Sequence, residues 1–256
     1  MTDRSINIEV GQSKILDLDS NEQGRFIAFT NSRTVITNDT SLTIEKEFRF
    51  PIIRRLDSTT FLIADTRTDK LPNGNIYNFN GQLLKSFLIG DGIQDIIVHD
   101  KRIVATYFDE GVFGDDGPNN DGLAIFDLLG HQLFGFNSSI ETIGIDDCYC
   151  ICKHKPNTIL FYAYSDFKVY ELNVDNFEFT SFDTPDDFSG ASAISSTNDN
   201  IIFHSSYHEK TSFFSWDKDK NEVVKFSNYS PLLKGIGNGK FLAFGDSGFT
   251  IINSVD

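Results

Sequence analysis

The chain has 256 residues and carries 37 acidic side chains against 22 basic ones, a net charge of −15. A surface of that sign repels nucleic-acid phosphates and anionic membranes, whereas it attracts basic partners. There is no run of about 18 apolar residues, and residues 1–10 lack a basic segment followed by an apolar stretch, so we expect neither a membrane span nor a signal peptide. The odd number of cysteines then predicts reduced thiols and a cytoplasmic location.

An internal repeat begins near Lys14 and continues along the chain. Each copy has an apolar strand, a second strand, a third strand with aromatic residues, a tight turn and a fourth strand ending in Phe. The second strands are expected at residues 25–29, 61–64, 102–108, 159–164, 201–204 and 240–244. The clearest hairpins of third and fourth strands are residues 75–87 and 123–136. Their turns contain Gly81 and Gly130, because glycine adopts positive φ at little cost.

The Phe residues that close the copies recur at similar intervals. They are Phe48, Phe87, Phe136, Phe182 and Phe226, separated by 39, 49, 46 and 44 residues. Blades of four-stranded propellers have repeats of about 40–50 residues. The sequence therefore predicts an all-β, six-bladed β-propeller with four-stranded antiparallel blades, forming one domain over residues 1–256. A two-sheet sandwich is the alternative architecture, and it does not explain the regular spacing.

The two ends of the chain complete one blade in this interpretation. The sixth copy has strands at residues 240–244 and 249–253 and then lacks a fourth strand. A spare strand, residues 6–10, precedes the first full copy. We expect this N-terminal strand to close the ring beside the last strand, which removes an open sheet edge.

An acidic, glycine-rich segment, residues 106–122, joins the second and third strands of the third copy. Its five carboxylates are Asp109, Glu110, Asp115, Asp116 and Asp121. Oxygen ligands on such a loop suit calcium, but the order lacks the pattern of an EF-hand loop. Two other interpretations are a solvated acidic turn and a protein-binding loop, since loops on rigid scaffolds often carry function.

Two further groups of residues could support chemistry. Asp109 and Glu110 could approach Asp146 and Asp147 at the central channel, where paired carboxylates can perform acid–base catalysis. Three cysteines and a histidine, Cys148, Cys150, Cys152 and His154, fall on one face of an expected strand. Same-face positions are about 6.5–7 Å apart, so these side chains fit a crowded core better than a tetrahedral zinc site. No Ser-His-Asp order or phosphate-binding glycine loop is present.

Three runs in the chain resemble a family of uncharacterised bacterial propellers: TYFDEGVFG (residues 106–114), GLAIFD (122–127) and IDDCY (145–149). In size, fold and acidity the chain also resembles propeller-type immunity proteins of bacterial contact-dependent inhibition and related toxin systems. This second resemblance implies a cytoplasmic protein that binds and blocks a basic toxin, often a nuclease.

The leading hypothesis is a non-enzymatic binding protein, monomeric before it binds a basic toxin domain. Its expected contacts are Asp109, Glu110, Asp115, Asp116 and Asp121, and no catalytic residue, cofactor or metal is expected. One alternative is a metal-dependent propeller hydrolase or lactonase that uses Asp109, Glu110, Asp146 or Asp147. The other alternative is a general scaffold for protein interactions.

Overall fold

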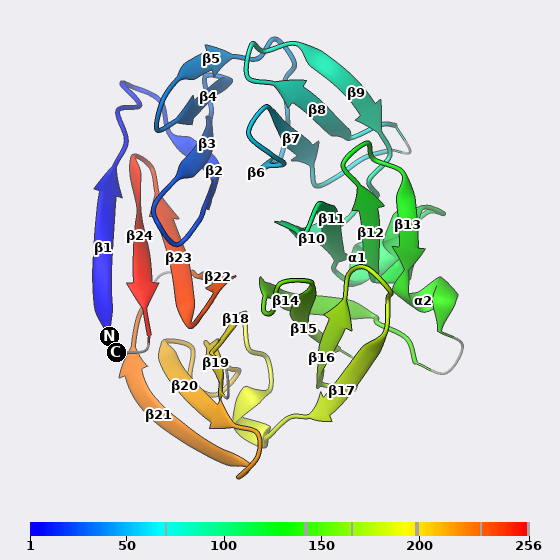
Figure 1. Ribbon diagram of the computed structural model, residues 1–256, viewed down its shortest axis with the longest axis vertical. Helices are drawn as coiled ribbons and strands as arrows, with labels where there is room; N and C mark the ends of the chain where they lie inside the picture. The colour runs from blue at the N-terminus through cyan, green and yellow to red at the C-terminus, as the bar shows by residue number, and fades with distance from the viewer. Residues whose placement is uncertain (70, 141–142, 165, 198–199, 231, 255–256) are drawn as a thin grey trace.

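Six four-stranded antiparallel sheets surround a central axis in the computed structural model, which describes residues 1–69, 71–140, 143–164, 166–197, 200–230 and 232–254 (Figure 1). Each sheet is one blade, and in five of the six blades the four strands follow one another in chain order from the axis outward. The predicted six-bladed propeller with four-stranded blades is therefore confirmed. We call the face where the inner strands begin the upper face and the opposite one the lower face.

The strands occupy four concentric positions. The inner strands are β2 (Ile15–Ser20), β6 (Pro51–Arg55), β10 (Ile93–His99), β14 (Asp147–Lys153), β18 (Ala193–Ser196) and β22 (Lys234–Gly237). The second strands are β3 (Phe26–Thr30), β7 (Thr60–Asp65), β11 (Arg102–Tyr107), β15 (Thr158–Tyr164), β19 (Asn200–His204) and β23 (Lys240–Gly245). The third strands are β4 (Thr34–Thr37), β8 (Gly74–Asn78), β12 (Leu123–Asp127), β16 (Lys168–Asn173), β20 (Ser212–Asp217) and β24 (Gly248–Asn253). The outer strands are β5 (Ser41–Thr43), β9 (Leu83–Phe87), β13 (Gln132–Gly135), β17 (Phe179–Asp183), β21 (Glu222–Asn228) and β1 (Thr2–Asn7).

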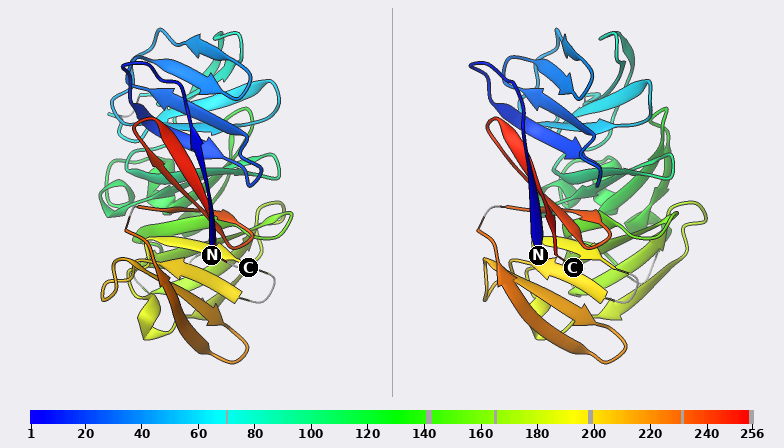
Figure 2. Two further views of the ribbon diagram at one scale, coloured as in Figure 1. Left: turned by 90° about the vertical axis from the view of Figure 1, so that its left-hand side faces the viewer. Right: turned by 60° about the vertical axis from the view of Figure 1, so that its left-hand side comes forward.

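The N-terminal strand closes the ring, but its bounds differ from the prediction. β1 spans Thr2–Asn7 and lies antiparallel along β24, with Thr2 opposite Asn253 and Asn7 opposite Gly248 (Figure 2). The expected strand, residues 6–10, was therefore placed too late. Ile8 is buried in a cluster with residues of β2 and β3, so it packs between the sixth and first blades instead of extending the ladder.

The core consists of apolar clusters between adjacent blades. In one of the aromatic groups, Phe136 meets Phe161 and Tyr170 edge to face, with ring centroids 5.5 and 5.4 Å apart. Phe161 and Tyr170 are themselves stacked at 4.9 Å. The second strands are buried on both sides, because each lies inside a blade whose two faces are covered by the neighbouring blades. This explains why they are the most regular feature of the sequence.

A few single-turn helices interrupt the connections, and the repeat pattern did not predict them. They are α1 (Asp109–Val112), η1 (Pro118–Asp121), α2 (Phe136–Ser139) and η2 (Asp186–Phe188). Among the helices in the described part of the chain, none is long and apolar enough to cross a membrane.

Candidate protein-binding face

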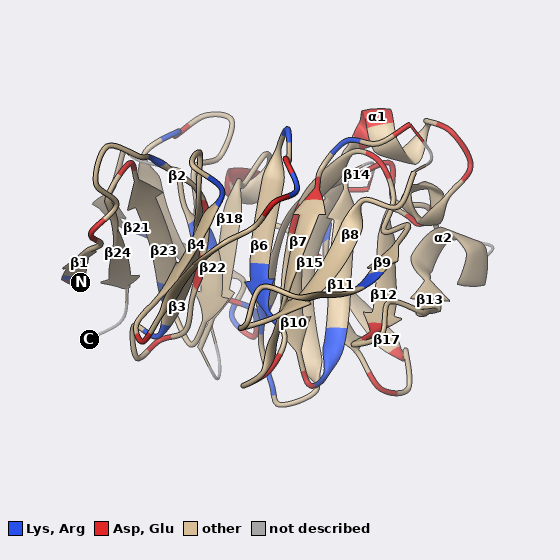
Figure 3. Cartoon of the chain, turned by 90° about the horizontal axis from the view of Figure 1, so that it is seen from above, with Lys and Arg blue, Asp and Glu red and all other residues tan. Residues whose placement is uncertain are grey.

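The acidic segment forms a structured projection on the upper face. It connects β11 to β12 as predicted, and it contains α1, a loop and η1. Figure 3 shows acidic residues over α1 and the loop that follows it. The projection rests on Gly92, which has a φ of +64°, and a Cβ there would lie 2.5 Å from the Cα of Gly111. Only glycine at both positions lets the two backbones approach so closely.

Two asparagines hold the projection in one shape. Asn119 is buried and donates from Nδ2 to the carbonyl oxygens of Gly111 and Asp115, at 2.7 and 2.9 Å. Asn120 donates to the carbonyl oxygen of Val112 at 2.9 Å. The backbone carbonyls of a solvated turn would bond to water, whereas here side chains of the same segment satisfy them. The acidic side chains are therefore presented on a rigid support.

Asp121 does not belong to the exposed acidic set. It is only 7% exposed, and its carboxylate accepts hydrogen bonds from Gln132 Nε2 at 2.7 Å and from the backbone nitrogen of Ser138 at 3.0 Å. It packs tightly against Gly135, where a Cβ would lie 1.9 Å from Asp121 Oδ2. Asp121 therefore ties the projection to β13 and α2, and its burial removes it from the surface on which it was expected to contact a partner.

Asp109, Glu110, Asp115 and Asp116 are exposed. Glu110 accepts a hydrogen bond from Arg67 Nη1 at 2.7 Å, and Arg67 also contacts Asp91 at 3.1 Å from Nε. Asp109 accepts from the backbone nitrogen of Glu110 at 2.7 Å. All four carboxylates are thus accessible to solvent, and Arg67 pairs with one of them, Glu110.

The structure brings together one of the expected carboxylate pairs at the channel. Asp147 begins β14 beside α1, and its pKa is raised to about 6, first by burial and then by the negative charge of Asp109. A carboxyl with such a pKa can hold a proton near neutral pH. In the described ranges, no three His, Cys, Asp or Glu side chains gather in an arrangement that could hold a metal ion.

Exposed apolar side chains gather on the same upper face, which sequence reasoning did not identify. They come from loops or strand ends of five blades: Phe50, Leu71, Phe113, Tyr164, Tyr207 and Leu232. Leu232 is 87% exposed and Phe113 71%. Within the described residues, the turns of the lower face contribute only Leu129 to the exposed large apolar side chains. In the sequence these residues resemble the apolar residues at strand ends. The pattern does not show whether another blade covers such a residue or leaves it exposed.

A cavity of about 460 Å³ opens at the upper end of the channel. Its walls are mostly apolar and include Leu232, Leu242 and Phe244, while Lys234 and Tyr149 contribute polar atoms. The hydroxyl oxygens of Tyr149 and Tyr207 lie 2.5 Å apart, which joins the cavity to the exposed apolar residues of the fifth blade. Volume and lining are typical of a site that takes an apolar side chain or small ligand.

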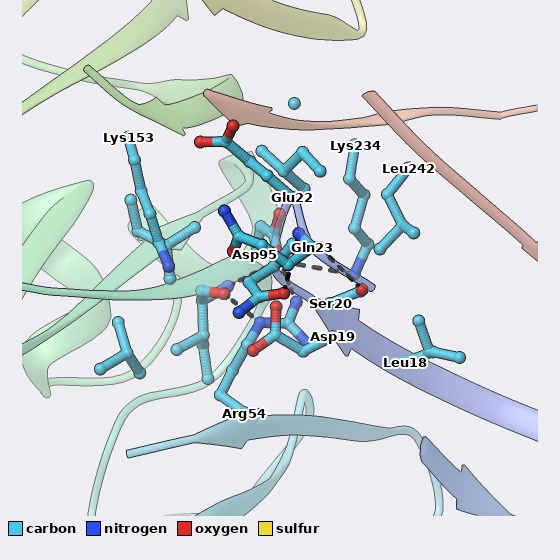
Figure 4. A pocket seen from close by; sticks show the side chains of 16 residues that line it. Leu18, Asp19, Ser20, Glu22, Gln23, Arg54, Asp95, Lys153, Lys234 and Leu242 are labelled. Carbon is cyan, nitrogen blue, oxygen red and sulfur yellow. Dashed lines mark hydrogen bonds and ion pairs between the residues drawn. The ribbon is translucent and has the colours of Figure 1, made fainter. Parts of the chain in front are cut away.

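An ionic network lies at the inner strands, and Figure 4 shows three of its members, Arg54, Asp95 and Lys234. Arg54 is 3% exposed and contacts Asp17 at 2.6 Å and Asp95 at 2.5 Å, and it also donates to the carbonyl oxygen of Ile96. Lys234 lies 3.0 Å from Asp17 and 3.5 Å from Asp95. Burial alone would raise the pKa of Asp17, but Lys234 and Arg54 outweigh it and hold that pKa below its usual value. The network joins inner strands of four blades, so its first effect is structural.

The three cysteines do not share one strand face as expected. A β-bulge between Cys148 and Cys150 shifts the alternation of β14. Cys148 therefore packs toward the third blade, whereas Cys150 and Cys152 pack in the cluster shared with the fifth blade. All three thiols are buried and free, and burial raises the pKa of each. The interpretation as core residues fits this packing.

No family model matches the sequence, and no curated protein does either. Solved structures match over most of the chain at low identity. A catalytically inactive virginiamycin B lyase from Staphylococcus aureus is 11% identical, with a TM-score of 0.54 over 98% of this chain and 99% of that one. The extracellular domain of the hybrid two component system BT3049 from B. thetaiotaomicron is 13% identical, with a TM-score of 0.60 over 94% of this chain and 33% of that one.

A third structure, the WD40 β-propeller domain of Doa1, is 8% identical, with a TM-score of 0.51 over 97% of this chain and 96% of that one. At these identities the likeness concerns the fold alone. Because a lyase, an extracellular domain of a two component system and a WD40 domain share it, the fold does not decide between an enzyme and a binding protein. The chain is similar in structure to β-propeller proteins of several functions.

Proposed function

We propose that this propeller is a protein-interaction scaffold whose upper face binds a basic partner. The observation that carries the proposal is that exposed apolar side chains of five blades share one face with the cavity at the channel mouth and with a rigid acidic projection. Contiguous exposed apolar residues within a polar rim mark interaction sites on soluble proteins. Aromatic and aliphatic anchors supply most of the binding energy at such sites.

The charge of the face selects the partner. Besides Asp109, Glu110, Asp115 and Asp116, the exposed acids Asp186 and Asp187 precede the fifth blade on the same side. Acidic residues at the rim increase the rate of encounter with a basic protein and disfavour acidic ones. The cavity of about 460 Å³ at the channel mouth has room for one apolar side chain of the partner, held between Leu232 and Tyr149.

The narrower form of the proposal is that the partner is a toxin domain, which the chain neutralises by covering it. Nucleic-acid-cleaving toxins are basic because they bind phosphate, and a net charge of −15 complements them. This form rests on charge and on the resemblance noted in the sequence. If it holds, co-expression of the chain with the captured protein restores the growth of cells that the partner alone arrests.

Affinity capture with matched variants tests the wider proposal. Wild-type protein is compared with Leu232→Asp and Phe113→Ser, and with Leu129→Ser as an exposed apolar control on the lower face. Both upper-face residues are largely solvent-exposed, so their substitution leaves the fold intact. We expect the wild-type protein to capture a basic protein that is released by salt. The upper-face variants should bind it roughly tenfold more weakly, and the affinity of the control should be unchanged.

A charge variant gives a second arm. Asp115→Lys combined with Asp116→Lys reverses two charges of the projection, and the control Asp219→Lys reverses one exposed charge in a lower-face turn, which is half that change. We expect the double variant to lose more binding free energy per reversed charge than the control loses. Its affinity should also depend less on salt concentration. Equal effects of upper-face and lower-face variants, or failure of the wild-type chain to retain any basic protein at low salt, would overturn the proposal.

A further inference from the structure

A second cavity, of about 530 Å³, lies at the lower face and is separate from the proposed partner surface. It is formed where β2 and β6 end, and Lys153 reaches it from the end of β14 across the channel. A smaller cavity of about 150 Å³ adjoins it and shares Asp19 and Lys153. Figure 4 shows both of these side chains extending into that shared space.

Three charged groups in this cavity form no ion pair within 4 Å among the described residues, although the charge of Asp19 acts at longer range on Arg54 and Arg55. Arg55 has no carboxylate within 4 Å among the described residues, although Arg54 beside it contacts two. Its guanidinium reaches the carbonyl oxygen of Phe26 only at 3.5 Å and lies over the ring of Phe79 at 4.7 Å. The adjacent residues differ because successive side chains of a strand point to opposite faces.

Lys153 and Asp19 complete the set. In the part of the chain that the structure describes, neither side chain makes a hydrogen bond or an ion pair. Both are partly buried, so their charges are only partly hydrated. Charged groups removed from water without a partner are unfavourable, which favours a ligand that pairs with them.

The other carboxylates of the cavity are already engaged. Asp57 accepts hydrogen bonds from the backbone nitrogens of Thr59 and Thr60, at 2.6 and 2.8 Å. Asp39 lies 3.6 Å from Arg25. The groups left over are therefore two cations and one carboxylate that face a common space.

We propose that this lower cavity binds a small zwitterion of the α-amino acid class. The ligand's carboxylate lies between the Arg55 guanidinium and the Lys153 ammonium, and its ammonium group pairs with Asp19. Ile27 and Phe79 line the same cavity and provide an apolar wall for the ligand's side chain. Guanidinium and ammonium donors bind carboxylates through charge-assisted hydrogen bonds, which are stronger than neutral ones.

Charge balance favours a zwitterion over an anion. Three basic side chains, Arg25, Arg55 and Lys153, line the cavity beside three acidic ones, Asp19, Asp39 and Asp57. A phosphate or simple carboxylate bound at Arg55 would share that guanidinium with Asp19, whose charge already acts on it, and would bring two like charges close together. A zwitterion satisfies both signs and adds no net charge to a chain that is already acidic.

Binding measurements with the full chain test the site. The common free L-amino acids are screened by the shift each causes in thermal unfolding, since a ligand that binds only the native state stabilises it. The best binder is then titrated by calorimetry beside its N-acetyl derivative, which has no ammonium group, and its amide, which has no carboxylate. We expect both derivatives to bind roughly tenfold more weakly or worse, as for the loss of a charged hydrogen bond.

Variants assign each charge to its partner. Asp19→Asn should weaken the amino acid but not the N-acetyl derivative, whereas Lys153→Gln should weaken the amino acid but not the amide. Arg55→Gln is a second test of the carboxylate contact should Lys153→Gln alter folding, which circular dichroism detects. Lys101→Gln, an exposed lysine in a lower-face turn outside the cavity, is the matched control and should change nothing.

Three outcomes would overturn the proposal: no free amino acid stabilises the chain, the derivatives bind as well as the amino acid, or Lys101→Gln weakens binding as much as Lys153→Gln. None of these measurements involves the upper face. Their failure therefore leaves the proposed scaffold function standing, and failure of the scaffold function leaves the lower cavity to be judged alone.

Discussion

Two ionic regions of this propeller use the same chemistry to different ends. In the channel, Arg54 meets Asp17 and Asp95 at 2.6 and 2.5 Å with almost no exposure to water. On the upper face, Arg67 meets Glu110 at 2.7 Å, but these side chains are 41% and 68% exposed. Buried charges depend on each other because water cannot replace a missing partner, whereas water readily replaces either member of an exposed pair. The distance between two charged atoms therefore does not by itself indicate how much an ion pair contributes to the stability of the fold.

The largest expected effect is that of Arg54→Met. The substitution leaves Asp17 and Asp95 buried with one remaining cation, Lys234, so we expect the free energy of unfolding to fall by about 3–5 kcal/mol. Urea denaturation followed by circular dichroism measures it. Arg67→Met removes the exposed pair and should change the same quantity by less than about 1 kcal/mol. Equal losses in the two variants would contradict the distinction between the regions.

A second comparison lies within the acidic projection. Asp121→Ala removes the acceptor of two hydrogen bonds, from Gln132 and the backbone of Ser138, and should lower the free energy of unfolding by about 1–3 kcal/mol. Asp116→Ala changes an exposed side chain of the same segment and should stay within about 0.5 kcal/mol of wild type. Urea denaturation of the two variants measures both changes in the free energy of unfolding. Destabilisation by Asp116→Ala as large as that by Asp121→Ala would show that the projection depends on its exposed charges.

The smallest expected effect concerns Asp147, which is between the two regions in burial. Its pKa is raised to about 6 by burial and by Asp109, from a usual value of 3.8. Between these values the folded chain keeps a proton that the unfolded chain has lost. The stabilisation from the neutral carboxyl is thus fully present below the usual pKa and is lost as the pH rises through about 6.

Titration by NMR of the labelled carboxyl group checks this directly. We expect a midpoint near 6 in the wild-type chain and a lower midpoint in Asp109→Asn, because the second cause of the shift is then gone. Asp147→Asn should remove this part of the pH dependence of stability, an effect below about 1 kcal/mol since the group is half exposed. A wild-type midpoint near the usual value would mean that water reaches Asp147 freely.

The blade pattern was visible in the sequence because it repeats. Second strands such as Phe26–Thr30 and Thr158–Tyr164 are buried on both sides in every blade, so their apolar runs recur with little variation. The predicted bounds of the first strand were less accurate. Ile8 is apolar because it packs between blades, and not because it pairs in the sheet. The sequence alone does not distinguish an apolar residue that extends a strand from one that packs between blades.

The site was only partly predictable for a related reason. Asp109 and Asp116 are exposed in the segment between β11 and β12, but Asp121, five residues after Asp116, is buried. Composition alone does not separate a carboxylate that faces water from one that accepts hydrogen bonds from its own fold. The bulge in β14, which moves Cys148 to the opposite side from Cys150, is equally absent from any alternation of residue types.

The sequence by itself determined the architecture, the net acidity and the location of the acidic projection. Repeats, charged residues and turn residues can each be recognised within a short segment of the chain. Only the tertiary structure decided which side chains meet. Arg54 and Arg55 are adjacent and chemically identical, yet Arg54 is enclosed by Asp17 and Asp95, whereas Arg55 has no carboxylate of the described residues within 4 Å in the cavity that it lines. Their difference arises from strands of other blades, far away in the chain, which closure of the ring brings to the same axis.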